Sequence, residues 1–195
     1  MGAREPYPKT ASQQGWARAA LEDGDLLDRF HLGDETAFEE LVERYHLPVY
    51  HLVYRLTHQR GDAEDLAQEV FLRAYRSLRS FRRASSLKTW LFQIAINLWR
   101  DHRRKARPPL ELPLPSAQDP GALARLERQE LHVQLQGAIA KLPEKQRATC
   151  VLRIFHDLSF KEIGELVGSP IATVKANYRH AVMRLRQLLP DLSCR

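Results

Sequence analysis

In two segments of this sequence, basic residues stand next to aromatic ones. These are the side chains best suited to binding another molecule. The segment 98–107 carries five cations and a single anion, Asp101, and it contains Trp99. Upstream, Phe81 stands among several arginines in a polar stretch. Cations follow a nucleic-acid backbone while bases stack on rings, so this pattern favours single-stranded DNA. In the alternative interpretation the cations are simply solvated; Trp99 fits a core position as well as an exposed one, whereas Trp90 fits the core.

A second basic segment, near the C-terminus, has the pattern of a helix-turn-helix. The run 159–162 (SFKE) is a capping box, and Gly168 ends the short helix that follows. Ser169 suits the cap of the next helix, and Pro170 suits its first turn. A short helix, a glycine turn and a longer basic helix are typical of a motif that reads the major groove, although a helical hairpin with a solvated basic face has the same pattern. The positions that could reach bases or phosphates are Thr173, Lys175, Ala176, Asn177, Arg179 and His180.

Catalytic and metal-binding patterns are missing from the sequence. The eight histidines are scattered, and His46 and His51 do not have the HExxH spacing. The sequence contains no GxSxG, P-loop or GxGxxG motif. Its two cysteines, Cys150 and Cys194, are not in CxxC spacing. We therefore expect no enzyme, no bound metal and no cofactor.

The elements that must position these residues are predicted to be helices. Apolar residues recur every three or four positions over 38–56, where Pro48 predicts a kink or two abutting helices. After Gly61 breaks this pattern, Asp62 and Asp65 form a variant capping box before a second helix. A third helix contains the apolar residues of 90–98, and Ser85 or Ser86 can cap it.

Five prolines between positions 107 and 121 predict an extended linker. Helical patterning resumes near Leu126, and Pro143 suits the first turn of a later helix. We therefore expect an all-α protein with two small helical domains joined by a Pro-rich extended linker, the second domain containing the helix-turn-helix. The expected boundaries are a flexible N-terminal tail at 1–22, a first domain at 23–107, the linker at 108–125 and a second domain at 126–190.

Charge is distributed unevenly within a net total of +6. Residues 22–65 carry 12 acidic and 4 basic side chains, whereas residues 66–195 carry 23 basic and 11 acidic ones. Because the basic part attracts polyanions and the acidic part repels them, two kinds of partner surface are the simplest explanation. An unevenly charged solvated surface is the alternative. The N-terminus has no apolar stretch, and no run approaches the roughly 20 apolar residues of a membrane helix, so we expect a cytoplasmic protein without membrane insertion.

Several motifs, in order along the chain, resemble those of the extracytoplasmic-function (ECF) sigma factors of bacterial RNA polymerase. Residues 62–71 (DAEDLAQEVF) resemble the polymerase-binding helix of that family. Residues 87–97 (LKTWLFQIAIN) resemble its promoter-melting segment. Residues 142–147 (LPEKQR) and 158–163 (LSFKEI) are similar to the start of its C-terminal domain, and 173–175 (TVK) to the entry of its recognition helix.

This resemblance implies a sigma factor that binds core RNA polymerase, recognises the −35 and −10 promoter elements and promotes promoter melting. The implied partners are promoter DNA and two parts of the polymerase, the clamp helices of the largest subunit and the beta flap. Many members are sequestered by an anti-sigma factor, which makes such a protein a candidate partner. The alternative function is a helix-turn-helix regulator that binds duplex DNA without being a polymerase subunit. A receiver of that class would show strands alternating with helices, and no such pattern occurs here.

The resemblance also implies three sets of site residues. The polymerase-binding set is Asp65, Gln68, Glu69, Leu72 and Arg76. The set for the −10 element and single-stranded DNA is Arg79, Phe81, Arg82, Arg83, Ser85, Ser86, Lys88, Asn97, Arg100, Arg103 and Arg104. The set for the −35 element is Arg147, Lys161, Thr173, Lys175, Ala176, Asn177, Arg179 and His180.

The sequence departs from the family pattern in its second half. Gly164 stands where alanine is common, and Ala172 stands where many members have glycine. The usual Ser-Arg after Lys175 is Ala176-Asn177. These differences fall on and beside the recognition helix, so no −35 consensus is carried over from other members.

Overall fold

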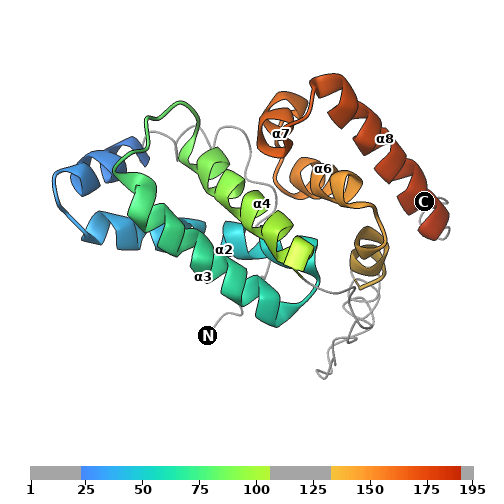
Figure 1. Ribbon diagram of the computed structural model, residues 1–195, viewed down its shortest axis with the longest axis horizontal. Coiled ribbons are helices and arrows are strands. Elements are labelled where there is room, and N and C mark those ends of the chain that lie inside the picture. The colour runs from blue at the N-terminus through green and yellow to red at the C-terminus, as the bar shows by residue number, and fades with distance from the viewer. Residues whose placement is uncertain (1–22, 106–132, 190–195) are drawn as a thin grey trace, which may run out of the picture.

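The computed structural model describes residues 23–105 and 133–189. All regular secondary structure within these ranges is helical, which confirms the all-α prediction. Two groups of helices are visible in Figure 1. The expected tail at 1–22, the linker at 108–125 and the start of the second domain at 126–132 lie outside the described residues. The helices are α2 (Thr36–Thr57), α3 (Arg60–Leu78) and α4 (Leu87–Lys105) in the first group, and α6 (Glu144–Phe155), α7 (Phe160–Val167) and α8 (Ile171–Leu188) in the second; residues 23–31 and 133–140 are also helical.

The first group is built on α2, which continues through Pro48 as a single helix rather than as two. Its apolar stripe, including Tyr45 and Leu52, is buried against α3 and α4. The capping box predicted at Asp62 and Asp65 is wrong. Gln59 is the N-cap of α3, and it makes no side-chain cap hydrogen bond. In a capping box a Glu side chain reaches back to the backbone N–H of the N-cap residue, and the shorter Asp65 stands in its place here. The Asp62 carboxylate pairs with His102.

Helix α4 begins as expected after Ser86, whose Oγ accepts a hydrogen bond from the backbone N–H of Thr89 at 3.1 Å. The two tryptophans of this helix have different environments. Trp99 is fully buried in the core. Trp90 is only partly buried, and its ring lies 4.9 Å from that of Phe81, centroid to centroid. The structure therefore assigns Trp99 to the core and leaves an edge of Trp90 beside the polar loop.

The helix-turn-helix is formed by α7 and α8. Ser159 and Glu162 make both bonds of the predicted capping box, at 3.2 and 2.8 Å. Gly168 ends α7 with φ +62°, a left-handed conformation that glycine adopts without strain. The cap predicted at Ser169 is wrong, because α8 has no side-chain cap hydrogen bond. The backbone N–H of Ser169 donates to the carbonyl oxygen of Gly164 at the end of α7. Pro170 takes the N-cap position of α8, one residue earlier than expected.

Gly164 is placed where α7 meets the turn into α8. A Cβ atom at this position would lie 2.8 Å from the carbonyl oxygen of Ser169, closer than real Cβ contacts allow. Glycine stands here in place of the alanine that is common in the family, because the backbone of the turn occupies the space that a methyl group would need.

The two groups of helices pack against each other. α4 contacts α7, and α2 contacts α6. Figure 1 shows α4 on the side of the first group that faces α6 and α7. In the described parts of the chain, no helix combines the length and the apolar character needed to cross a membrane.

Candidate nucleic-acid interface

The loop before α4 presents cations and an aromatic ring together. Arg82 and Ser85 are exposed, and Phe81 is partly buried against Trp90. Arg83 adopts φ +54° and pairs with the carboxylate of Asp28, which fixes the turn against the helical residues 23–31. The loop is thus anchored on one side while Arg82 remains open to solvent.

Arg79 and Ser86 complete the same loop. The Arg79 guanidinium lies 5.9 Å from the centre of the Phe30 ring, and the Arg79 carbonyl oxygen faces Nε2 of His31 at 3.3 Å. Both residues are exposed, although the Ser86 hydroxyl is engaged in capping α4. Arg79 is therefore held by an aromatic contact and a backbone contact of the first domain.

The C-terminal end of α4 is a second exposed cationic surface. Arg103 and Arg104 are both exposed. The Arg103 guanidinium lies 6.0 Å from the centre of the buried Trp99 ring, and Arg104 pairs with Asp101. From the sequence, Trp99 fits base stacking and the core equally well. In the structure its ring is buried and makes a cation–π contact with Arg103.

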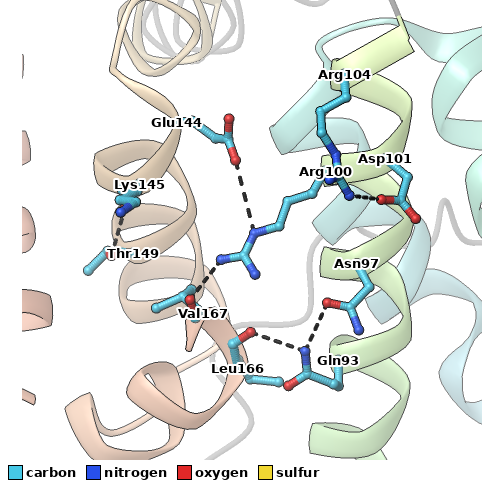
Figure 2. Close-up of polar contacts among 10 residues, drawn as sticks. All are labelled: Gln93, Asn97, Arg100, Asp101, Arg104, Glu144, Lys145, Thr149, Leu166 and Val167. Atoms are coloured by element: carbon cyan, nitrogen blue, oxygen red, sulfur yellow. Dashed lines mark hydrogen bonds and ion pairs between the residues drawn. The ribbon is translucent and has the colours of Figure 1, made fainter. Parts of the chain in front are cut away.

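The remaining α4 candidates face the second domain. Lys88 is buried, and its Nζ donates to the carbonyl oxygen of His156 at 3.0 Å. Burial lowers the pKa of Lys88 to about 8. Arg100 donates to the carbonyl oxygen of Val167 at 2.9 Å, whereas Asn97 stays exposed (Figure 2). In this arrangement Lys88 is buried against protein, whereas Arg100 is bonded to protein and stays partly exposed.

Gln93 was not predicted as a site residue, yet it makes two polar contacts on this face. Its Nε2 donates to the carbonyl oxygen of Leu166 at 3.1 Å and to Oδ1 of Asn97 at 3.1 Å (Figure 2). The available signal was its spacing, four residues before Asn97 and seven before Arg100, which puts all three on one helix face.

The recognition face of α8 is open to solvent. Thr173, Lys175, Arg179 and His180 are exposed, and Ala176 and Asn177 are partly so, in the first ten residues of α8. Tyr178 packs its ring against Phe160 of α7, with centroids 5.6 Å apart, and Val174 is buried. The apolar face of α8 is therefore used in holding the motif together, which leaves the opposite face available for a DNA groove.

The other two residues of the −35 set lie in different environments. Lys161 is exposed on α7. Arg147 is buried on α6, and it donates to the carbonyl oxygens of Leu56, at 2.9 Å, and Ala140. Burial lowers the pKa of Arg147 to about 10. In this arrangement the Arg147 guanidinium is bonded to backbone carbonyls of both helical groups.

The polymerase set lies along one face of α3. Asp65, Gln68 and Arg76 are exposed. Leu72 is 53% exposed, which is unusual for an apolar side chain in the middle of a helix and marks this face as a candidate contact surface. Glu69 is partly exposed and pairs with Arg73 at 2.7 Å.

Taken together, these features define a class of protein: a two-domain helical DNA-binding protein with a helix-turn-helix and a separate cationic helix. Two family patterns match the chain, Sigma-70 region 2 at residues 41–108 and Sigma-70, region 4 at residues 132–185. The first contains α3 and α4, and the second contains the helix-turn-helix.

Curated relatives match nearly the whole chain. The ECF RNA polymerase sigma factor SigW of Bacillus subtilis is 36% identical over 176 residues, which cover 82% of this chain and 92% of the relative. The RNA polymerase sigma-H factor of Pseudomonas aeruginosa is 34% identical over 184 residues, covering 88% and 95%. The chain belongs to the ECF RNA polymerase sigma factors, and it functions as an RNA polymerase sigma factor.

Solved structures share the fold. CnrH in complex with the cytosolic domain of CnrY has a TM-score of 0.66 at 25% identity, covering 87% of this chain and 97% of CnrH. The sigma factor RpoE in complex with the anti-sigma factor NepR, from Bartonella quintana, has a TM-score of 0.66 at 22% identity, covering 78% and 96%. The two-domain helical architecture is thus found in known sigma factors.

Proposed function

We propose that the three surfaces of this sigma factor divide the work of initiation among themselves. The observation that carries the proposal is the separation of two exposed cationic surfaces onto different domains, the end of α4 and the face of α8. A third, mixed surface on α3 contains acids and an exposed Leu72. The two cationic surfaces suit DNA, and the α3 surface suits a basic surface of another protein.

The α3 surface is the proposed contact for core polymerase, at the clamp helices of its largest subunit. Asp65, Gln68 and Glu69 supply acceptors for basic side chains of the partner. Leu72 supplies apolar area to bury, and Arg76 supplies a cation at the edge. An interface core with one apolar anchor and a charged rim has the composition expected of a specific protein contact.

The loop before α4 and the α4 surface are the proposed contact for the −10 element and the separated strand. Phe81 and Trp90 form an aromatic pair beside Arg82, so a base turned out of the duplex meets rings and a cation together. Arg103 and Arg104 at the far end of the helix suit phosphates of the same strand. The rest of this proposed set is Arg79, Arg83, Ser85, Ser86, Lys88, Asn97 and Arg100.

The α8 surface is the proposed reader of the −35 element as duplex DNA. Thr173 and Lys175 lie at the N-terminal end of the helix, the end that enters the major groove in this motif. Arg179 and His180 follow one turn later and suit base edges or phosphates. Lys161 adds a phosphate contact from α7.

We also propose that the domain boundaries are those indicated by the sequence: 1–22, 23–107, 108–125 and 126–190. The activity proposed for each surface is binding, without catalysis. The solved relatives were captured with CnrY and with the anti-sigma factor NepR, so we propose that an anti-sigma factor also binds this chain. The exposed Leu72 and Tyr75 of α3 are the side chains best suited to such a contact.

The test is reconstituted transcription. Purified chain is mixed with core RNA polymerase and promoter DNA, and run-off transcripts and permanganate-reactive thymines near the start site are measured. We expect a stoichiometric complex and opening of the duplex only when polymerase and chain are both present. Duplex binding by the chain alone, without transcription when polymerase is added, would support the helix-turn-helix regulator instead.

A further inference from the structure

The loop before α4 is held from one side by the helical residues 23–31. Nη1 and Nη2 of Arg83 donate to the two carboxylate oxygens of Asp28, and Nη2 also lies 3.4 Å from the carbonyl oxygen of Gly24, one turn earlier. A guanidinium that meets a carboxylate through two nitrogens is fixed in orientation as well as in position. The contact therefore defines where the turn at Arg83 lies relative to residues 23–31.

The backbone of Arg83 shows that the turn needs this support. Its φ is +54°, in the left-handed region that residues with a side chain seldom occupy. Such a conformation persists only where surrounding contacts fix it. The pair with Asp28 supplies a contact of this kind from 55 positions away in the sequence. The turn at Arg83 therefore depends on a partner outside the loop.

The helical residues 23–31 are themselves fixed to the rest of the first domain. Asp23 is buried, and its carboxylate accepts hydrogen bonds from the Tyr45 hydroxyl at 2.6 Å and from Nη1 of Arg44 at 2.8 Å, both on α2. Phe30, near the other end of the segment, is buried in the core. Because both ends of the segment are anchored, it is a firm support for the loop.

Asp28 places a negative charge beside a cationic loop. Its side chain is 66% exposed, and the arginines of the loop, Arg79, Arg82 and Arg83, are exposed as well. A carboxylate at this place repels phosphates, so it does not favour a direct contact with DNA. The role that its position does favour is that of a fixed partner for Arg83.

We propose that Asp28 is a positioning residue for recognition of the −10 element, which acts through Arg83 to hold the loop in the conformation that receives a base. The proposal rests on the role proposed above for this loop at the −10 element. Phe81 and Arg82, the ring and the cation assigned to that base, directly precede Arg83 in the chain. A loop that is held in advance meets the base without first being ordered, so promoter opening and discrimination between bases both depend on Asp28.

Limited trypsin digestion of the full unbound chain tests the contact without polymerase or DNA. Asp28→Ala removes the carboxylate, and Asp25→Ala, at an exposed acid of the same helical segment, is the matched control. Cleavage after Arg82, followed by mass spectrometry, reports how often the loop opens. We expect cleavage to rise about twofold to fivefold in Asp28→Ala, the range for one exposed ion pair, and to stay unchanged in the control. Asp28→Glu, which keeps a carboxylate, should be cleaved more slowly than Asp28→Ala. Equal cleavage of Asp28→Ala and the parent overturns the proposal.

Promoter opening tests what the contact does. The template is a promoter mapped from the 5′ ends of transcripts that the parent chain and core polymerase make from genomic DNA. Permanganate reactivity is followed at saturating polymerase, on this template and on templates with each other base at the −10 positions. We expect Asp28→Ala to slow opening about threefold and to discriminate less between bases. Loss of a negative charge by itself strengthens DNA binding, so Asp25→Ala should open the promoter no more slowly than the parent. Faster opening by Asp28→Ala overturns the proposal.

The dependence on Arg83 separates positioning from a local effect of charge. In a chain that already carries Arg83→Gln the partner of Asp28 is lost, so adding Asp28→Ala should change neither cleavage nor opening further. An effect of Asp28→Ala that is equally large in both backgrounds overturns the proposal.

Phe81→Ala distinguishes failure of this proposal from failure of the proposed function. If Phe81→Ala opens the promoter as the parent does, the role of the loop at the −10 element is wrong, and the role of Asp28 is wrong with it. If Phe81→Ala is defective and Asp28→Ala is not, the role of the loop stands and only that of Asp28 is wrong.

Discussion

Nη2 of Arg100 lies 2.9 Å from the carbonyl oxygen of Val167, so a cation of α4 is bonded to the end of α7, the first helix of the helix-turn-helix. Nε of the same guanidinium lies 4.0 Å from Oε1 of Glu144, so a weak ion pair also joins α4 to α6. The surface of α4 that we propose for DNA is thereby bonded to the second domain. The α3 and α8 surfaces are not covered by this junction, and variants there report on their partners directly.

Charge reversal on α3 should weaken the complex with core polymerase. In the variant Asp65→Lys with Glu69→Lys, two acceptors for basic partner residues become repulsive, and we expect affinity to fall at least about tenfold. Fluorescence anisotropy with labelled chain measures the dissociation constant. Glu165→Lys, an exposed charge reversal on α7, is the control and should bind as the parent does. Equal affinities for all three proteins would remove α3 from the interface.

Loss of the cations on α8 should reduce transcription that depends on a −35 element. Lys175→Ala and Arg179→Ala each remove a candidate phosphate or base contact, and each should lower the slope of log affinity against log salt by about one if it binds phosphate. Run-off transcription and salt titration measure the two effects. Core polymerase binding should be unchanged, and Arg186→Ala, exposed in the last turn of the same helix, should resemble the parent. Normal promoter activity in both variants would contradict the assignment.

Gly164→Ala should destabilise the helix-turn-helix although alanine favours helices. The added methyl group meets the carbonyl oxygen of Ser169 at 2.8 Å, and this overlap outweighs the helix preference of about 1 kcal/mol. We expect a net loss of about 1 to 2 kcal/mol in the free energy of unfolding, measured in urea. Gly137→Ala is the matched control, because no atom lies within 4 Å of its added Cβ, and it should stabilise by about 0.5 to 1 kcal/mol. Stabilisation by both substitutions would refute the steric explanation.

Acidification should destabilise the packing around His58. Burial, with a further contribution from the Arg147 charge, lowers the pKa of His58 from 6.5 to about 4. Because the unfolded chain binds the proton first, the stability contributed by neutral His58 is complete above pH 6.5 and is lost as the pH falls from 6.5 towards 4. The expected loss is at most about 2 kcal/mol between pH 6.5 and 5.

The variant His58→Asn separates this effect from the titration of other groups. His58 is the C-cap of α2 with φ +59°, a conformation that asparagine tolerates well. Urea unfolding of parent and variant across this pH range should show a smaller dependence on pH in the variant. Identical slopes would mean that His58 does not titrate in this way. Burial also lowers the pKa of His156, so part of the dependence should remain in both proteins.

Local features of the chain could be predicted from the sequence because they depend on neighbouring residues. Ser159 and Glu162 are three residues apart, and any helix that begins there makes the same two bonds. Gly168 ends α7 for an equally local reason, its tolerance of a positive φ. The same reasoning failed at Ser169, because α8 begins one residue later, with Pro170 at its N-cap, and sequence alone does not fix a helix end to the residue.

By itself, the sequence determined the helical class, the helix-turn-helix and the family, since periodicity, caps and motif order are properties of the chain read in one dimension. Only the tertiary structure decided that Trp99 is buried and that Arg147 and Lys88 point into the junction between domains. A cation in a sequence suits a phosphate and a helix C-terminal carbonyl equally well. Which of the two it meets depends on the packing of residues far apart in the chain, 91 positions in the case of Arg147 and Leu56.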